Sequence, residues 1–195
     1  MLSILQAAGW PIIPLVLCSV VAMALIVERF LTLRAAKVAP SRLVDEVISV
    51  TRASLPTADT IQKLADNSVL GQVLAQGLQT AADGRISEER LRAGLEAAGR
   101  QAVHELERNL NALGTIASAA PLFGLLGTVI GMIEIFAASG GTTSGSGDPQ
   151  ALAHGISVAL YNTAFGLMVA IPSLMAHRHF RTKVDGFALQ MEQSA

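Results

Sequence analysis

Two apolar stretches of this chain carry polar side chains that could hold water or an ion inside a membrane. One stretch contains Thr128, and the other contains Ser157, Tyr161, Asn162 and Thr163 within two helical turns. Hydroxyl and amide groups both donate and accept hydrogen bonds, which suits them to holding water. An unpaired amide in lipid costs several kcal/mol, so we expect Asn162 to face protein or water. We expect the cluster to face a central cavity; the alternative is that it only joins helices.

Small residues lie beside these polar groups in both stretches. Gly124, Gly127 and Gly131 occur in the first stretch and Gly166 in the second. Gly127 and Gly131 form a small-xxx-small motif, which lets another helix approach the backbone closely. Helix packing alone would explain the glycines, and a lone threonine hydroxyl can bond a preceding backbone carbonyl. The pattern therefore predicts close helix contacts and leaves a further role of Thr128 open.

The remaining reactive side chains do not form a catalytic or metal-binding pattern. Glu134 lies near the end of its apolar stretch, where an interfacial position is expected and a proton relay is the alternative. The sequence contains no nucleophile with a plausible base, no phosphate-binding glycine loop and no Cys/His metal spacing. The single Cys18 cannot form a disulfide within the chain. We therefore expect no enzyme activity, no metal and no cofactor.

Long charge-free stretches predict an all-α membrane protein with three transmembrane helices. Only 15% of the residues are charged, against about 25% in a typical soluble domain, and the mean hydropathy is +0.49. About 20 apolar residues in a helix cross a ~30 Å hydrocarbon core. We treat residues 1–195 as a single domain with these segments: a first span at about 11–33, a cytoplasmic helical insertion at about 34–109, a second span at about 110–137, a periplasmic loop at about 138–151, a third span at about 152–177 and a cytoplasmic C-terminal helix at 178–195.

The basic residues predict the orientation of these spans. All 14 Lys and Arg lie within residues 28–108 or after Ala176. The positive-inside rule therefore predicts that these segments lie in the cytoplasm and the N-terminus lies outside. The net charge of −1 gives no reason to expect binding to nucleic acid, and membrane lipid is the expected surrounding. The chain is thus expected to be a multi-pass membrane protein.

The second span is predicted to begin deep in the cytoplasm. Ser87 with Glu88 resembles a helix start, and apolar residues then recur at steps of four and three without a strong breaker before Pro121. A helix of about 50 residues would be roughly 75 Å long. A narrow apolar stripe on so long a helix needs neighbours, which predicts that the second and third helices extend into a cytoplasmic helical domain within an oligomeric ring.

Two stretches of the sequence resemble a known family. Residues 113–132, LGTIASAAPLFGLLGTVIGM, are similar to the second-span signature of the ExbB/TolQ/MotA proton channel family. Residues 155–172, GISVALYNTAFGLMVAIP, are similar to its third-span signature. The Glu28-Arg29 pair that closes the first span also fits the family. Among the members of the family, the length of the chain is most similar to that of ExbB.

The resemblance implies an assembly and partners. Family members form a homo-pentamer around two copies of a single-span partner of the ExbD/TolR type, which brings a transmembrane aspartate into the pore. Proton flow past that aspartate drives motion that ExbB systems pass to a TonB-like protein for import across the outer membrane. Thr128 and Thr163 align with the pore-lining threonines of the family.

One position departs from the family pattern. ExbB and TolQ proteins usually carry a glutamate in the third span, and this chain has Val158 there. The resemblance therefore leaves open the ExbB or TolQ branch and the choice between proton and sodium. We expect an ExbB-like stator subunit that energises TonB-dependent protein transport. The alternatives are a TolQ-like subunit for envelope maintenance and a non-conducting helical membrane scaffold.

Overall fold

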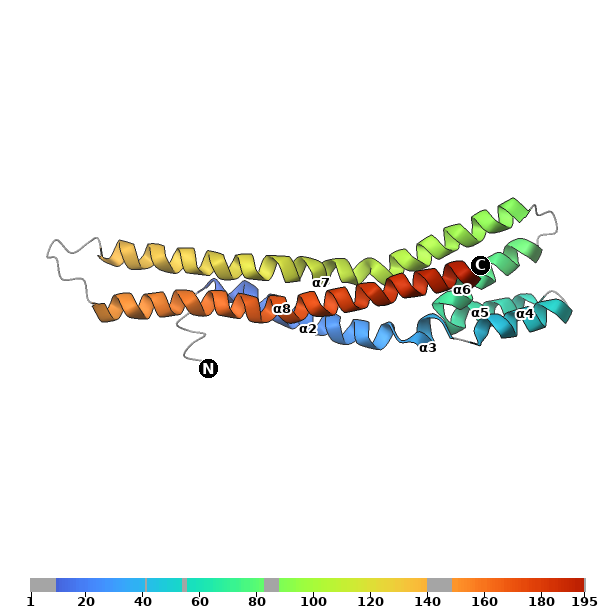
Figure 1. The fold of residues 1–195 in the computed structure, drawn as a ribbon, viewed down its shortest axis with the longest axis horizontal. Coiled ribbons are helices and arrows are strands. Elements are labelled where there is room, and N and C mark those ends of the chain that lie inside the picture. Colours follow the sequence, from blue (N-terminus) through green and yellow to red (C-terminus); the bar gives the residue numbers. More distant parts are fainter. Residues whose placement is uncertain (1–9, 41, 54–55, 83–87, 140–148, 195) are drawn as a thin grey trace. The chain divides into compact units, whose positions relative to one another are not determined.

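A computed structural model describes residues 10–40, 42–53, 56–82, 88–139 and 149–194 of the chain (Figure 1). Every element assigned in these ranges is a helix, which confirms the all-α prediction for the part of the chain that the structure describes. Three helices include segments long and apolar enough to cross a membrane: α2 (Ile12–Thr32), α7 (Glu88–Ser139) and α8 (Pro149–Ser194). The protein is therefore an all-α, multi-pass membrane protein.

Four shorter helices lie between α2 and α7 in the sequence: α3 (Ala35–Val38), α4 (Leu43–Ala53), α5 (Ala58–Asn67) and α6 (Val69–Ala82). The apolar spacing over residues 57–82 is close to that of one helix, but the structure divides it at Ser68. Ser68 has extended backbone angles, φ −162° and ψ 166°, and its Oγ accepts a hydrogen bond of 3.0 Å from the N–H of Gly71. A serine that caps the next helix therefore interrupts the pattern.

The long helix predicted from residue 88 is present as α7, which continues through Pro121. Glu88 and Glu89 occupy its first turn, where acidic side chains are favourable to the helix dipole. Ser87, expected as the start signal, lies outside the described residues. α8 begins at Pro149, a residue whose missing N–H is tolerated in the first turn of a helix.

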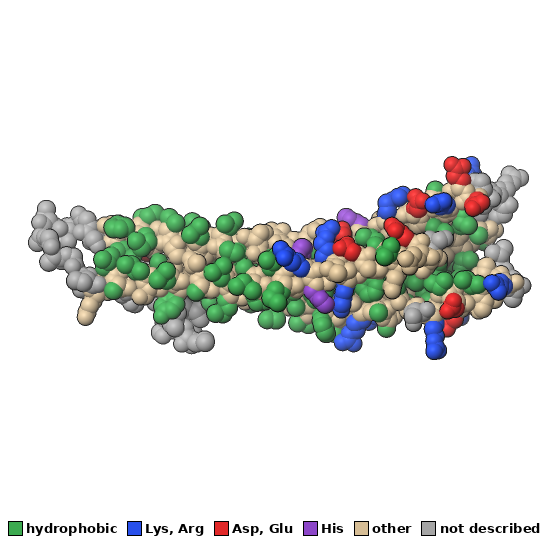
Figure 2. All heavy atoms as spheres, viewed as in Figure 1, with side chains coloured by type: hydrophobic (Ala, Val, Ile, Leu, Met, Phe, Trp, Pro, Cys, Tyr) green, Lys and Arg blue, Asp and Glu red, His purple; other side chains and the backbone are tan. Residues whose placement is uncertain are grey.

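The chain divides into two compact units that we describe separately. The apolar unit comprises Met1–Ile26 and Asn111–His177, and the polar unit comprises Val27–Leu110 and Arg178–Ala195. Glu134 and Asp148 are the only Lys, Arg, Asp or Glu residues in the sequence of the apolar unit. Figure 2 shows the same separation on its visible face, where hydrophobic side chains dominate the apolar unit and charged side chains gather on the polar unit.

The core of the apolar unit is formed by three helices. Leu15 of α2 and Ala120 of α7 are 0% exposed, and Val169 and Ala170 of α8 pack with them. Large side chains on the outer faces remain exposed, for example Leu17 at 65% and Met168 at 67%. Exposed apolar faces of this kind are expected on helices that contact lipid or another chain.

The polar unit has its own core. Its buried side chains come from the end of α2, from α3 to α6, from the first part of α7 and from the last part of α8. The buried apolar residues are Leu33, Val38, Leu43, Ile61, Leu70, Val73, Ala75, Ala102, Leu106, Leu110, Phe180, Val184, Phe187 and Met191. The last turns of α8 are thus part of a packed helical unit.

Candidate functional site

α7 and α8 approach each other closely at positions where both carry glycine. A Cβ atom placed on Gly166 would lie 2.7 Å from the carbonyl oxygen of Ala120 and 3.1 Å from the Cα of Gly124. A Cβ atom placed on Gly124 would lie 2.8 Å from the carbonyl oxygen of Asn162. Side chains do not fit at these distances, so the close approach depends on glycine at both positions.

The amide of Asn162 occupies the space that another glycine leaves. A Cβ atom on Gly127 would lie 2.8 Å from the Cβ and 3.0 Å from the Nδ2 of Asn162, whose side chain is 1% exposed. One turn further along α7, a Cβ atom on Gly131 would lie 3.4 Å from the Cβ of Ala159, which is an ordinary contact. Within a single chain, Asn162 therefore faces protein and lies buried between α7 and α8.

The two threonine hydroxyls lie close to this contact. The Oγ1 of Thr163 donates a hydrogen bond of 3.3 Å to the carbonyl oxygen of Gly124 and so links α8 to α7. The Oγ1 of Thr128 donates a hydrogen bond of 2.6 Å to the carbonyl oxygen of Leu125 on its own helix. Both threonines are half-buried. Each hydroxyl uses its proton within the protein and can accept further hydrogen bonds through its oxygen.

The other polar residues of the predicted cluster lie on exposed surface. Ser157 is exposed and its hydroxyl donates a 2.9 Å hydrogen bond to the carbonyl oxygen of Ala153, and the Tyr161 ring is 50% exposed. Glu134 is exposed on α7, and no ion pair is recorded for it among the residues that the structure describes. Val158 is half-buried. The structure thus places Asn162 and Thr163 at the helix contact and Ser157, Tyr161 and Glu134 on the outside of the chain.

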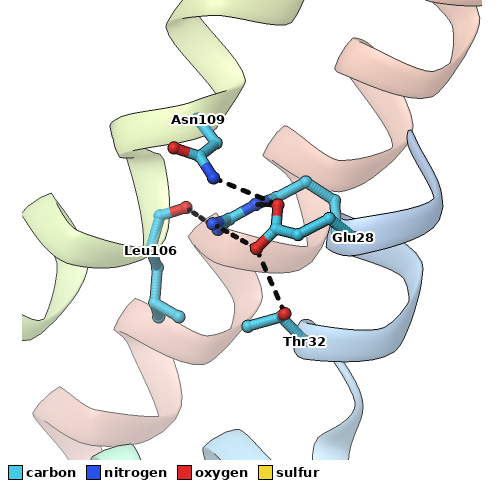
Figure 3. A network of polar contacts seen from close by, with 5 residues as sticks. Glu28, Thr32, Leu106 and Asn109 are labelled. Carbon is cyan, nitrogen blue, oxygen red and sulfur yellow. Dashed lines mark hydrogen bonds and ion pairs between the residues drawn. The ribbon is translucent and has the colours of Figure 1, made fainter. Parts of the chain in front are cut away.

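A second polar site lies in the polar unit, where the end of α2 meets α7 (Figure 3). The guanidinium of Arg29 is 5% exposed and donates two hydrogen bonds to the carboxylate of Glu28, at 2.8 and 3.0 Å. Its Nη1 donates a third, of 2.9 Å, to the carbonyl oxygen of Leu106 on α7. The carboxylate also accepts 3.1 Å and 3.3 Å hydrogen bonds from Asn109 and Thr32.

This network compensates two charges at the end of an apolar helix. Paired contacts between a guanidinium and a carboxylate are among the stronger hydrogen bonds in proteins, and a buried charge requires such partners. The sequence identified Glu28 and Arg29 as a pair at the membrane edge but did not identify Asn109 or the Leu106 carbonyl. The available signal was the position of Asn109, the first residue of the charge-free stretch that contains the second span.

No cluster of potential metal ligands is present in the described ranges, which contain no group of three His, Cys, Asp or Glu side chains that could hold an ion. His177 packs against α7, where a Cβ atom on Gly114 would lie 3.0 Å from its Nε2. His179 instead contacts the ring of Phe180, with ring centroids 5.7 Å apart. The two histidines therefore make different contacts.

Comparison with known proteins identifies relatives that cover the chain. Residues 65–193 match the model of the MotA/TolQ/ExbB proton channel family. Biopolymer transport protein ExbB-like 3 of Synechocystis sp. is 32% identical over 192 residues, which cover 97% of this chain and 89% of that protein. The ExbB of Helicobacter pylori is 46% identical over 81 residues, or 42% of this chain and 54% of that protein. The TolQ of Haemophilus influenzae is 39% identical over 83 residues, or 43% of this chain and 36% of that protein.

Proposed function

The chain belongs to the MotA/TolQ/ExbB proton channel family, and on that premise we propose that it is an ExbB-like stator subunit of a motor driven by the proton-motive force. In this proposal the protein lies in the inner membrane of a bacterium with its N-terminus in the periplasm. It works with a single-span partner of the ExbD type and passes motion to a TonB-like protein. An ExbB-like relative aligns with 97% of this chain, which supports the ExbB branch of the family.

One observation carries the site assignment: a threonine hydroxyl bridges the two helices at their glycine contact. Thr163 donates to the Gly124 carbonyl, so the hydroxyl is fixed in position and its oxygen can accept a hydrogen bond from water or from a protonated carboxyl group. The Thr128 hydroxyl on α7 is likewise fixed, by its bond to the Leu125 carbonyl of the same helix, and its oxygen can also accept a hydrogen bond. We assign both hydroxyls to the ion pathway, beside the aspartate that the partner would bring.

Three further residues are assigned to the same pathway. Ser157 and Tyr161 are exposed on α8 and can meet water or a neighbouring chain. Asn162 is buried within the chain and would act by holding α7 and α8 at their present distance. Glu134 lies near the outer end of α7 and is assigned a role at the interface, with a relay as the alternative.

The exposed apolar faces support assembly into a ring. α2, α7 and α8 each expose large hydrophobic side chains, which require lipid or other chains to cover them. A ring of identical chains would cover part of this surface and enclose a shared axis. We propose five copies, as the family resemblance implies.

Complementation of a bacterial host that lacks its own ExbB and TolQ tests this function. The chain is expressed with an ExbD-like protein, and uptake of a ferric siderophore through a TonB-dependent receptor is measured. We expect uptake to be restored and a protonophore to abolish it. Absence of uptake from a correctly inserted ring would contradict the proposal.

A TolQ-like role is the second candidate, because the chain also matches a TolQ over 83 residues at 39% identity. The same host separates the two roles. Restored resistance of the outer membrane to detergent without siderophore uptake would favour the TolQ-like role. A ring that restores neither activity and conducts no protons in liposomes would favour the scaffold.

A further inference from the structure

The segment that leaves α2 exposes basic side chains, and no acidic residue lies between Thr32 and Arg42. After Glu28, the next acidic residue is Asp45. Arg34, Lys37 and Arg42 lie between them, and all three are exposed. No ion pair is recorded for any of the three within the described part of the chain. We call Arg34, Lys37 and Arg42 the basic patch.

The backbone of this segment is held in place by buried neighbours. Leu33 and Val38 are each 1% exposed and lie on either side of Arg34 and Lys37. Arg34 has extended angles, φ −85° and ψ 133°, and separates α2 from α3. Its carbonyl oxygen accepts a hydrogen bond of 2.9 Å from the N–H of Lys37. The side chains of Arg34 and Lys37 therefore project from a backbone segment whose position is fixed by its buried neighbours.

Exposed apolar side chains lie just before the patch. Phe30 is 59% exposed and Leu31 is 48% exposed, in the last turn of α2, and Arg34 lies two residues beyond the end of that helix at Thr32. The two residue steps from the end of α2 to Arg34 span at most about 7 Å, which is close to the thickness of roughly 6 Å of one headgroup layer. A helix end of this kind presents apolar groups to lipid tails and basic groups to the headgroups.

The guanidinium of Arg29, near the end of α2, is by contrast paired within the protein. It is 5% exposed and bonds the Glu28 carboxylate and the Leu106 carbonyl. Arg34 and Lys37 have no comparable partner recorded in the described residues and face outward. Water, counter-ions and lipid headgroups can therefore reach both side chains.

We propose that the basic patch binds the phosphate groups of anionic phospholipids in the leaflet at the end of α2. One guanidinium group can donate two parallel hydrogen bonds to the oxygens of a phosphate group. The Lys37 ammonium adds a positive point charge beside it. Exposed basic residues next to a membrane span attract anionic headgroups, each strengthening binding about fivefold. Exposed Phe30 and Leu31 pack against the acyl chains of the same lipids. This binding requires membrane insertion but neither ion flow nor a partner protein.

Lipid selectivity of the purified protein tests the proposal. The protein is reconstituted in bilayers, and its association with spin-labelled phosphatidylglycerol is compared with that of spin-labelled phosphatidylcholine by electron spin resonance. We expect phosphatidylglycerol to be preferred about fivefold or more, and the preference to fall as salt rises. The Arg34→Gln/Lys37→Gln double variant should lose most of this preference.

A matched variant controls for net charge. Lys63→Gln/Arg92→Gln removes the same charge from exposed side chains that pair with Asp59 and Glu96, and it should keep the preference. Equal association of both lipids with the unaltered protein would overturn the proposal. An equal loss in both double variants would also overturn it, because net charge alone would then explain the selectivity. Failure of siderophore uptake with lipid selectivity retained would contradict only the proposed function.

Discussion

The hydroxyl of Thr163 on α8 bonds the backbone carbonyl of Gly124 on α7 across 3.3 Å. This contact exists because neither Gly124 nor Gly166 carries a side chain that would separate the two helices. The hydroxyl proton is engaged by protein, whereas the oxygen keeps acceptor capacity for water. A hydrophobic residue of the same shape would keep the packing and remove that capacity.

We expect Thr163→Val to retain the ring and to lose transport. Valine replaces the hydroxyl by a methyl group at nearly constant volume, and only the hydrogen-bonding function disappears. Siderophore uptake in the complemented host should fall at least about tenfold, the equivalent of about 1.4 kcal/mol. Thr128→Val should act in the same direction. Full uptake in both single variants and in their combination would show that the hydroxyls serve packing only.

Gly124→Ala should destabilise the α7–α8 contact, whereas Gly131→Ala should not. A methyl group on Gly124 would lie 2.8 Å from a backbone oxygen, whereas one on Gly131 would meet the Cβ of Ala159 at 3.4 Å. Overpacking of this kind costs about 1–3 kcal/mol. Thermal unfolding in detergent should therefore show a lower midpoint for Gly124→Ala alone. Equal midpoints for the two variants would contradict the close approach.

Arg29→Gln is expected to lower the free energy of unfolding by about 2 kcal/mol, since it leaves the Glu28 carboxylate without its main partner. This loss of stability is smaller than the loss on breaking a fully buried ion pair, because the Glu28 side chain is 41% exposed. Denaturant unfolding of Arg29→Gln, Glu28→Gln and the double variant measures the coupling between the two side chains. Lys63→Gln, which breaks an exposed pair with Asp59, should change stability by less than about 1 kcal/mol. Additive effects at residues 28 and 29 would argue against the pair.

Single cysteines should report opposite sides of the membrane at Ser87 and Ser144. The Lys and Arg residues flank only the inner ends of the predicted spans, which places residue 87 inside and residue 144 outside. The variants are made in a Cys18→Ala background and treated with an impermeant thiol reagent after the outer membrane is permeabilised. Labelling is expected at position 144 only. Labelling at position 87 alone would show that the chain has the opposite orientation to the predicted one.

Glu134→Gln should cause partial or no loss of siderophore uptake. The carboxylate is exposed near the C-terminal end of α7, and a residue at the membrane interface is expected to tolerate loss of its charge. Thr163→Val, measured in the same assay, is the reference for a complete loss. Abolished uptake in Glu134→Gln, with normal expression, would mean that the ion relay runs through this carboxylate.

The sequence was sufficient to predict the three long apolar helices but not their contacts. Charge-free runs and apolar spacing predicted α2, α7 and α8, because each signal lies within one segment. The burial of Asn162 against Gly127 depends on the rotation and register of two helices, which the spacing along either helix does not determine. The bond between Arg29 and the Leu106 carbonyl was unpredictable for a further reason, since every residue type carries that carbonyl.

The two partners of Arg29 are also synthesised at different times. Glu28 precedes Arg29 directly, whereas Leu106 follows it by 77 residues. At about 5–20 residues per second, Arg29 would wait roughly 4–15 s before Leu106 is added to the chain. During that time the adjacent carboxylate alone can neutralise the guanidinium. A neighbouring acid at this position therefore gives the Arg29 guanidinium a partner well before Leu106 exists.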